Sequence, residues 1–447
     1  GQGKQEEAVA QYRQALALKP TYAEAYNNLG NVLQAQGKWA KAVVEYRQAL
    51  ALRPAFAEAH NNLGNALKAQ GKLEEAEAQY RQALALKPTF ATALSNLGLV
   101  LQEQGRLEEA AASYRQALAL QPNDGIRIKL ATMLPVIIGA GQAVRTIRKQ
   151  YEENLTALLE SKLTLNDPVQ EVGQTNFYLA YHGQNNRDLQ VKMAQLYECA
   201  CPALLYTAPH CFARPQSRKS SKIKIGFISK FFRNHTIGKC AQGVLANLSR
   251  EKFCVYALFV PPVEDDVISN FIQQHADKSV MLPGNLEATR EIIAREELDV
   301  LFYQDIGMEP FTYFLAFSRL APVQCVFFGH PDTTGIRNID YFVSSVNVEP
   351  PNGDQHYSEQ LIKLKSQLAY YYKPVPPNPL KTRNQFGLDD EEHIYICPQT
   401  LFKFHPDFDE ILAGILQGDS RARLVLIGGK VPHWSELLLH RFKQTMP

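Results

Sequence analysis

The chain has 447 residues, 45% of them hydrophobic, and its 47 basic and 45 acidic residues leave a net charge of only +2. This length is enough for about three domains, and the near-neutral charge gives no sign of a nucleic-acid-binding face. The seven cysteines lack the CxxC spacing of zinc or redox sites, which indicates reduced thiols in a cytoplasm, and no apolar run approaches the roughly 18 residues of a membrane span.

The first 124 residues repeat with a period of 34. Each full unit predicts two helices, at 23–36 and 39–52 in the first of them, separated by a glycine turn and ended by a proline. This is the tetratricopeptide pattern, so we expect an α-solenoid of a half repeat and three full repeats over 1–124. The repeated positions are Gly37, Gly71 and Gly105; Tyr12, Tyr46, Tyr80 and Tyr114; and Pro20, Pro54, Pro88 and Pro122.

One asparagine position recurs in the first helix of each full repeat, as Asn28, Asn62 and Asn96. First helices line the concave side of such a solenoid. Because an amide carries both a donor and an acceptor, a row of amides can bind a peptide backbone whatever its side chains. These three residues are therefore candidates for peptide binding. The alternative is that they solvate a helix face or bond between repeats.

The period of 34 disappears over 125–221. Apolar residues there keep a mostly helical spacing, as in 143–163 and 189–205, with breaks at prolines. We expect helices that cap the array and join it to the next domain. A polar and basic stretch at 214–222 is interpreted as a linker.

From Lys222 onward, short apolar strands alternate with amphipathic helices such as 287–297 and 408–416. This alternation predicts parallel sheets whose sites lie beyond the carboxyl ends of the strands. The predicted strands are 223–229, 253–260, 280–283, 300–303, 324–328, 341–345, 361–364, 393–397 and 424–427.

Polar side chains follow three of these strands. The first loop ends in a histidine just before a helix that would begin at Thr236, and the third carries a lysine before a helix begun by Pro406-Asp407. Helix amides and a lysine can together bind a phosphate, although no Walker loop or GxGxxG fingerprint occurs. The residues concerned are His235 in the first loop; His330, Thr333, Thr334 and Gly335 in the second; and Gln399, Thr400 and Lys403 in the third.

Four motifs in this order behind the repeats carry a family resemblance. They are FRNHTIG at 232–238, FGHPDTTGIRNIDY at 328–341, HYSEQLIKL at 356–364 and LFKFHP at 401–406. Together they resemble the O-GlcNAc transferase and SPINDLY family of glycosyltransferases. The resemblance implies two facing Rossmann-like domains, the GT-B type, with the first at 222–380 and the second, incomplete, beginning at 381–447.

The resemblance also implies roles for the site residues. His235 matches an active-site histidine that acts as a base or orients the acceptor, and Lys403 matches a lysine that contacts the donor diphosphate. His330 to Gly335 match a loop near the donor, and Gln399 lies one position from a family glutamine. The chain departs from the family at Gly307-Met308, where many members carry Gly-His, so a second catalytic histidine is not supported; Asp305 could substitute as a polar group.

The repeats and the resemblance together imply a protein glycosyltransferase that moves GlcNAc or a hexose from a nucleotide diphosphate sugar, expected to be UDP-linked, to Ser/Thr hydroxyls of polypeptides held in the repeat groove. The implied transfer is inverting, with no cofactor, no metal and no nucleic-acid or membrane partner. The alternatives are an inactive interaction scaffold and a related transferase acting on Asn side chains or glycans. Since 381–447 covers only part of a second Rossmann-like half, we expect this stretch alone to transfer little sugar.

Overall fold

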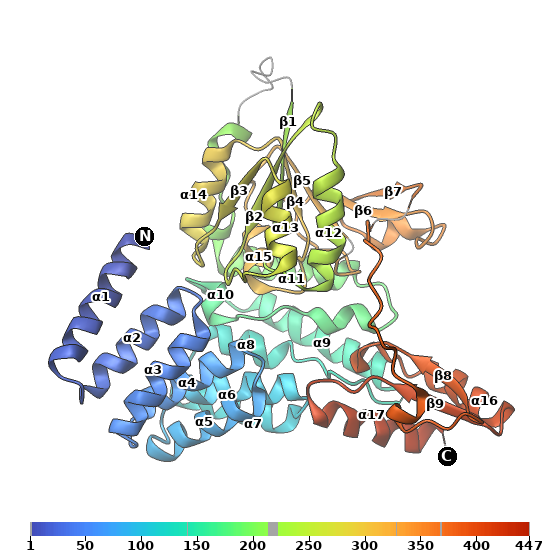
Figure 1. Ribbon diagram of the computed structural model, residues 1–447, viewed down its shortest axis with the longest axis horizontal. Helices are drawn as coiled ribbons and strands as arrows, with labels where there is room; N and C mark the ends of the chain where they lie inside the picture. The colour runs from blue at the N-terminus through green and yellow to red at the C-terminus, as the bar shows by residue number, and fades with distance from the viewer. Residues whose placement is uncertain (1, 141, 213–221, 328, 367–368, 447) are drawn as a thin grey trace.

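The structure is a computed structural model that describes residues 2–140, 142–212, 222–327, 329–366 and 369–446. Except for Lys222, the predicted basic linker lies outside the described residues. Figure 1 shows a helical solenoid at lower left, helices of the middle segment above it, a parallel sheet at the top and a C-terminal part at lower right.

The solenoid consists of paired antiparallel helices. The predicted helix boundaries agree with the structure to within one residue, and the predicted tetratricopeptide solenoid is present. Tyr46, Tyr80 and Tyr114 are fully buried, whereas Tyr12 of the half repeat is partly buried. The ring of Tyr46 lies against Gly30 of the neighbouring helix, as Tyr80 lies against Gly64. The helices are α1 (Gln2–Leu18), α2 (Ala23–Ala35), α3 (Trp39–Leu52), α4 (Ala57–Ala69), α5 (Leu73–Leu86), α6 (Ala91–Gln104) and α7 (Leu107–Leu120).

The middle segment extends the solenoid and carries the sheet. Its first helix packs on α7, and its buried residues share one apolar core with the helix that follows β4. Tyr197, for example, meets Phe314 edge to face with ring centroids 4.9 Å apart. The elements are α8 (Asp124–Ala131), α9 (Gln142–Glu160), α10 (Pro168–Glu171) and α11 (Arg187–Ala200), with short 3-10 turns η1 (Phe177–Tyr181), η2 (Pro202–Leu204) and η3 (Pro209–Cys211).

A seven-stranded parallel sheet follows, in the order β3-β2-β1-β4-β5-β6-β7. The parallel sheet predicted from the alternation is confirmed, with strand ends shifted by no more than two residues. The strands are β1 (Ile223–Ser229), β2 (Phe253–Phe259), β3 (Lys278–Met281), β4 (Val300–Tyr303), β5 (Val323–Phe327), β6 (Tyr341–Ser345) and β7 (Gln360–Leu364). The connections include α12 (Thr236–Asn247), α13 (Val267–His275), α14 (Leu286–Glu296), α15 (Pro310–Leu315) and the 3-10 turn η4 (Gly353–His356). Because β1 pairs with both β2 and β4, the strand order reverses between β1 and β4.

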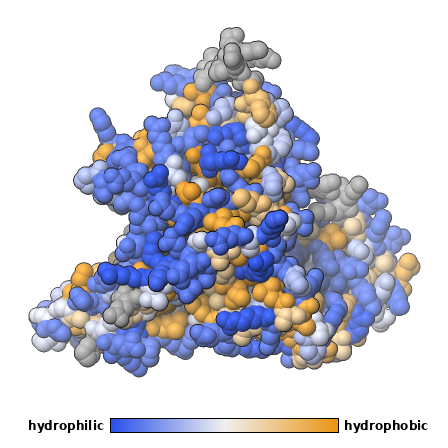
Figure 2. Space-filling view, turned by 180° about the vertical axis from the view of Figure 1, so that it is seen from behind, coloured by the Kyte–Doolittle hydropathy of each residue, from blue (hydrophilic) through white to orange (hydrophobic). Residues whose placement is uncertain are grey.

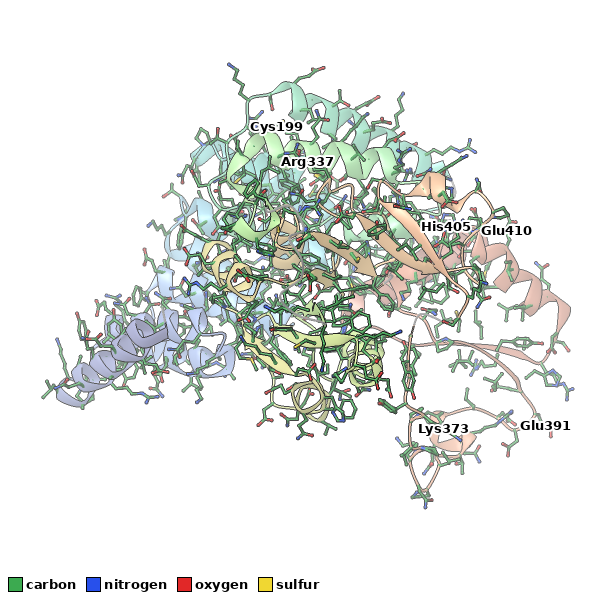
Figure 3. All side chains as sticks on the ribbon, turned by 90° about the horizontal axis from the view of Figure 1, so that it is seen from above. Cys199, Arg337, Lys373, Glu391, His405 and Glu410 are labelled. Atoms are coloured by element: carbon green, nitrogen blue, oxygen red, sulfur yellow. The ribbon has the colours of Figure 1, made fainter. Side chains whose placement is uncertain are left out.

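The C-terminal part has its own two-stranded parallel sheet of β8 (His393–Cys397) and β9 (Ala422–Leu426). It also contains η5 (Arg383–Phe386), η6 (Leu401–Lys403), α16 (Phe408–Gly418) and α17 (Pro432–Thr445). The segment that leads to it extends away from the body of the molecule, where Figure 3 labels Lys373 and Glu391.

Two contacts fix the C-terminal part against the helical regions. The Trp434 indole nitrogen donates to the carbonyl of Glu103 in α6 at 3.0 Å. Arg441, buried in an ion pair with Asp409 (2.8 Å), also donates to the carbonyl of Ile138 in the middle segment. The C-terminal part is therefore attached to the solenoid and to the middle segment.

Candidate active site

The strand order reverses where β1 and β4 end side by side, which is where parallel sheets place their ligands. The side chain of Asp305, just after β4, accepts two hydrogen bonds on one carboxylate oxygen. Ser229 Oγ donates at 2.9 Å and the Lys230 amide at 2.8 Å. The ammonium of Lys230 pairs with Glu309 at 2.7 Å. The two loops that leave this edge are thus bound to each other.

His235 lies at the end of the β1 loop and caps α12. Its Nδ1 accepts the amide of Ile237 at 3.2 Å, and its ring stacks on Phe231 with centroids 4.3 Å apart. Partial burial, together with the positive charges of Arg233 and Lys239, lowers the pKa of the imidazole. A neutral ring whose Nδ1 accepts a bond carries its proton on Nε2, so this geometry presents His235 as a hydrogen-bond donor.

His330 follows β5 and is buried, with 3% of its surface exposed. Its ring stacks on Phe177 at 5.1 Å and lies so close to Gly307, whose φ is +92°, that a side chain at Gly307 would overlap it. Burial lowers the pKa of His330 to about 3, and the ring is therefore neutral at physiological pH. This histidine joins the β5 loop to the β4 loop and to η1.

The threonines after His330 are bound to one carboxylate. Thr333 donates to Glu359 at 2.6 Å; the amide of Thr334 donates to the other oxygen at 2.8 Å, and its hydroxyl also donates there. Gly335, with φ at +71°, packs against the backbone of Gln190 in α11. Both hydroxyls are therefore engaged within the protein, and sequence reasoning missed Glu359, which lies in the HYSEQL segment.

The third loop carries Lys403, Gln399 and Thr400, all exposed. The ammonium of Lys403 lies 5.9 Å from the ring centroid of Tyr181 in η1. The adjacent Phe402 packs edge-on against Tyr181, with centroids 5.0 Å apart. His405, two residues further on, is labelled in Figure 3 near the boundary between the C-terminal part and the centre of the molecule.

A continuous set of contacts joins the three loops. Ile237, two residues after His235, lies against Gly329 of the β5 loop, since a Cβ added there would be 2.8 Å from its side chain. From His330 the contacts run through Phe177 to Phe402, whose ring centroids are 5.4 Å apart. Within the described residues no contact joins His235 directly to Lys403.

The aromatic turn η1 thus connects the sheet with the C-terminal part. The residue pattern of η1 in the sequence did not predict these contacts. Figure 2 shows the surface hollowed between these two parts, on the left of that view. His235 and Lys403 lie at separate ends of this connected set of contacts.

The asparagine row bonds from repeat to repeat. The amide nitrogen of Asn62 donates to Asn27 at 3.0 Å and to Asn31 at 3.1 Å in the preceding repeat. Asn96 makes the equivalent pair of bonds one repeat later, at 3.0 Å each. The donors of these two amides are therefore used between repeats, while Asn28 is half-buried in the first full repeat.

Two further properties of the described ranges bear on function. In them, no group of three or more His, Cys, Asp or Glu side chains is arranged to hold a metal ion. Nor does any helix in those ranges have the length and apolar character needed to cross a bilayer.

Family models match two regions of the chain. A TPR repeat model matches 2–37, 30–71 and 64–105, and a tetratricopeptide repeat model matches 91–124. The glycosyl transferase family 41 model matches 180–371, the region that contains the loops after β1, β4 and β5. The chain joins tetratricopeptide repeats to a glycosyltransferase family 41 region. The expected resemblance is confirmed; the third loop, with Lys403, lies beyond the family 41 match.

Known proteins with similar sequences include two transferases. A probable UDP-N-acetylglucosamine–peptide N-acetylglucosaminyltransferase SEC of Arabidopsis thaliana is 25% identical over 253 residues, 54% of this chain and 26% of that protein. A UDP-glucose:protein N-beta-glucosyltransferase of Actinobacillus pleuropneumoniae is 25% identical over 201 residues, 44% of this chain and 31% of that protein. The chain thus spans less than a third of the length of either relative.

The fold is also similar to a solved structure. A mutant of the Thermobaculum terrenum O-GlcNAc transferase superposes with a TM-score of 0.63 at 24% identity, covering 95% of this chain and 72% of that one. The order of a helical solenoid followed by a parallel sheet is therefore shared with that protein.

Proposed function

We propose that this chain is part of a protein glycosyltransferase that moves GlcNAc or glucose from a UDP-sugar to polypeptide acceptors. One observation carries the proposal: within the family 41 region, the loops after β1, β4 and β5 meet at the reversal of strand order, and this region is joined to a tetratricopeptide solenoid. Such an edge binds small anionic ligands, and such a solenoid binds proteins.

The donor would lie between the sheet and the C-terminal part. In this proposal β1–β7 form the first of two facing Rossmann-like halves, and β8, β9, α16 and α17 begin the second. Lys403, exposed beside Tyr181, would stabilise the negative charge that develops on the leaving diphosphate. Gln399 and Thr400, in the same loop, and the backbone from His330 to Gly335 would border the donor.

His235 would contact the acceptor or the transferred sugar through Nε2. In the tautomer selected by the Ile237 amide, the ring orients its partner by donating a hydrogen bond. To act as a base it would have to give up that bond. We therefore propose an orienting role for His235, with the acceptor proton passing to an oxygen of the departing diphosphate, directly or through water.

The acceptor would be a polypeptide, with Ser/Thr hydroxyls as the modified groups and transfer with inversion and without a metal. The solenoid would present it, with Asn28 and the carbonyl oxygens of Asn62 and Asn96 as contacts. The seven cysteines are all free, which supports a reducing, cytoplasmic setting.

The test is transfer itself. The chain, and the complete gene product from which it comes, are incubated with a candidate acceptor protein and UDP-GlcNAc or UDP-glucose, with and without a chelator. Intact-mass analysis should show acceptor carrying one or more sugars, and fragmentation should identify the modified residues. Modification of Asn would favour the N-linked alternative. Absence of transfer from either UDP-sugar, with folded protein, would contradict the proposal.

A scaffold without catalysis is the second candidate. The feature that favours this candidate is Gly307-Met308, which stands where many family members carry Gly-His. Gly307 packs against His330, and its carbonyl accepts a 2.6 Å hydrogen bond from Thr175. It predicts that the solenoid captures the acceptor while neither the chain nor the complete gene product modifies it.

A further inference from the structure

We infer that Asp305 is a positioning residue that fixes the orientation of His235 through Ser229 and Phe231. The inference concerns the local geometry of this chain, and its consequence for sugar transfer rests on the function proposed above. Three contacts connect the carboxylate after β4 to the imidazole after β1, although the two residues are 70 positions apart in the chain.

The first contact is the bond from Ser229 Oγ to Asp305 at 2.9 Å. The second runs from the amide of Phe231 to the same Ser229 oxygen at 2.8 Å. The third is the stacking of the Phe231 ring on His235, at 4.3 Å with an interplanar angle of 22°. The hydroxyl of Ser229 thus donates to the carboxylate and accepts from the loop, so its orientation is determined by both partners.

Asp305 is suited to hold this loop because it cannot move to solvent. Its side chain is 0% exposed, and its Oδ2 also accepts the Lys230 amide at 2.8 Å. The other oxygen, Oδ1, is buried without a hydrogen-bond partner among the described residues. A buried carboxylate with an unpartnered oxygen destabilises the fold. The two hydrogen bonds that Asp305 accepts from the β1 loop account for its presence at this position.

A second carboxylate holds the loop from the opposite side. Asp266, which caps α13, accepts the amide of Asn234 at 2.6 Å, and Arg233 forms an ion pair with Glu264 in the same connection. His235 therefore lies between one anchor that acts through Phe231 and another that acts through Asn234. A ring held from both sides is preoriented before any substrate arrives, which is how orientation contributes to rate.

The experiment measures the His235 ring itself. In the protein labelled with ¹⁵N-histidine, the His235 nitrogen signals, assigned with His235→Gln, should report the Nε2–H tautomer and a pKa below that of free histidine. Asp305→Ala should move these signals toward the tautomer average and raise the pKa of His235. Asp305→Asn, whose amide oxygen can accept both bonds, should restore them.

Asp299→Ala is the matched control. Asp299 precedes β4 and accepts the Lys224 amide of β1 at 2.8 Å, so it makes the same kind of bond between the same two strands at the opposite edge. It should leave the His235 signals unchanged. If Asp305→Ala does not fold, Ser229→Ala removes the first two contacts alone and should shift His235 in the same direction.

Turnover gives a second readout. In the complete gene product, Asp305→Ala should lower kcat by about ten- to a hundredfold while changing KM for the UDP-sugar less than about twofold. His235 signals that stay unchanged in both Asp305→Ala and Ser229→Ala would overturn the inference. If no variant transfers sugar at all, the proposed function fails, while the spectra still decide the role of Asp305.

Discussion

The repeats and the carboxyl edge of the sheet differ in how completely their buried polar groups are hydrogen-bonded. In the repeats, polar side chains satisfy one another: the hydroxyl of Tyr80 donates to Asn65 at 2.7 Å, and Asn65 also accepts from Asn96. Among the described buried side-chain nitrogen and oxygen atoms without a partner, Arg53 Nε alone lies in the repeats, and the rest lie from Tyr151 onward.

Two of those atoms, Asp305 Oδ1 and His330 Nδ1, belong to the loops of the candidate site. A buried polar network in which every group is hydrogen-bonded favours a single packing arrangement. A buried polar group without a partner destabilises the fold, and interactions elsewhere must offset that cost. The polar groups of the solenoid therefore stabilise a regular packing, whereas the strand-end loops keep unpaired buried atoms at a cost in stability while holding side chains in place.

Removing a repeat tyrosine should produce the largest change in stability. Tyr80→Ala should lower the free energy of unfolding by about 3–5 kcal/mol, because it deletes a fully buried ring and leaves Asn65 without that donor. Urea denaturation measures the change. Tyr22→Ala, at a 40% exposed aromatic residue, is the control and should cost little. A similar loss in both variants would mean that the repeat core is not organised as described.

The next largest expected effect comes from replacing the lysine of the third loop. Lys403→Ala should cost about 2–4 kcal/mol of transition-state stabilisation if Lys403 contacts the leaving diphosphate, with the free energy of unfolding unchanged because the side chain is exposed. The measurement is kcat/KM for the UDP-sugar in the complete gene product. Lys373→Ala, in the segment labelled in Figure 3 away from the body, is the control. Unchanged turnover in Lys403→Ala would place that ammonium outside the site.

Asp305 should make stability depend on pH in an unusual direction. Burial, with the negative charge of Glu309, raises the pKa of Asp305 to about 6 from its ordinary value of 3.8. The folded state therefore holds a proton that the unfolded state has lost between pH 4 and 6, and the free energy of unfolding contributed by this group falls as pH rises through that window.

In the parent protein, this group should lower the free energy of unfolding by about 1–3 kcal/mol between pH 4 and 7, and Asp305→Asn should abolish that fall. Urea denaturation at each pH measures it. Asp266→Asn is the contrasting variant. Burial raises the pKa of Asp266, but hydrogen bonds from backbone amides outweigh it and lower the pKa overall, so its contribution is constant above about pH 5. An equal pH slope in the parent and in Asp305→Asn would show that the carboxylate is solvated.

The smallest effect tests the asparagine row. Asn62→Ala removes two bonds between repeats and should cost about 1–2 kcal/mol of stability. Asn28 makes no such pair of bonds to a preceding repeat among the described residues, so Asn28→Ala should cost less. Acceptor binding, measured by calorimetry at a temperature where both variants are folded, separates the two roles. Weaker binding in Asn28→Ala with unchanged stability would support a peptide contact.

The sequence was most informative where local signals determine structure. The glycine and proline that recur every 34 residues gave helix ends within one residue, and apolar runs such as 223–229 gave the strands. β3 was placed two residues late because Lys278 and Ser279, at its start, are polar residues on a partly exposed strand. Periodicity and apolar runs report burial, and they fail where a strand is not buried.

The candidate site was predicted less completely, for a physical reason. His235, His330 and Lys403 follow strands or precede helices, which is a local property. Glu359 binds the threonines of another loop from 25 residues away, and Phe177 reaches His330 from the middle segment. Such partners depend on how distant segments meet, and a single sequence carries no local mark of that.

The bond from Trp434 to Glu103 has a mechanical consequence. It attaches α17 to α6, in the third full repeat of the solenoid. In the same C-terminal part, η6 borders η1. If the solenoid binds a polypeptide, as proposed, any change of its curvature that displaces α6 would also displace α17 and the C-terminal part. The distance between the ammonium of Lys403 and the imidazole of His235 would then depend in part on the curvature of the solenoid.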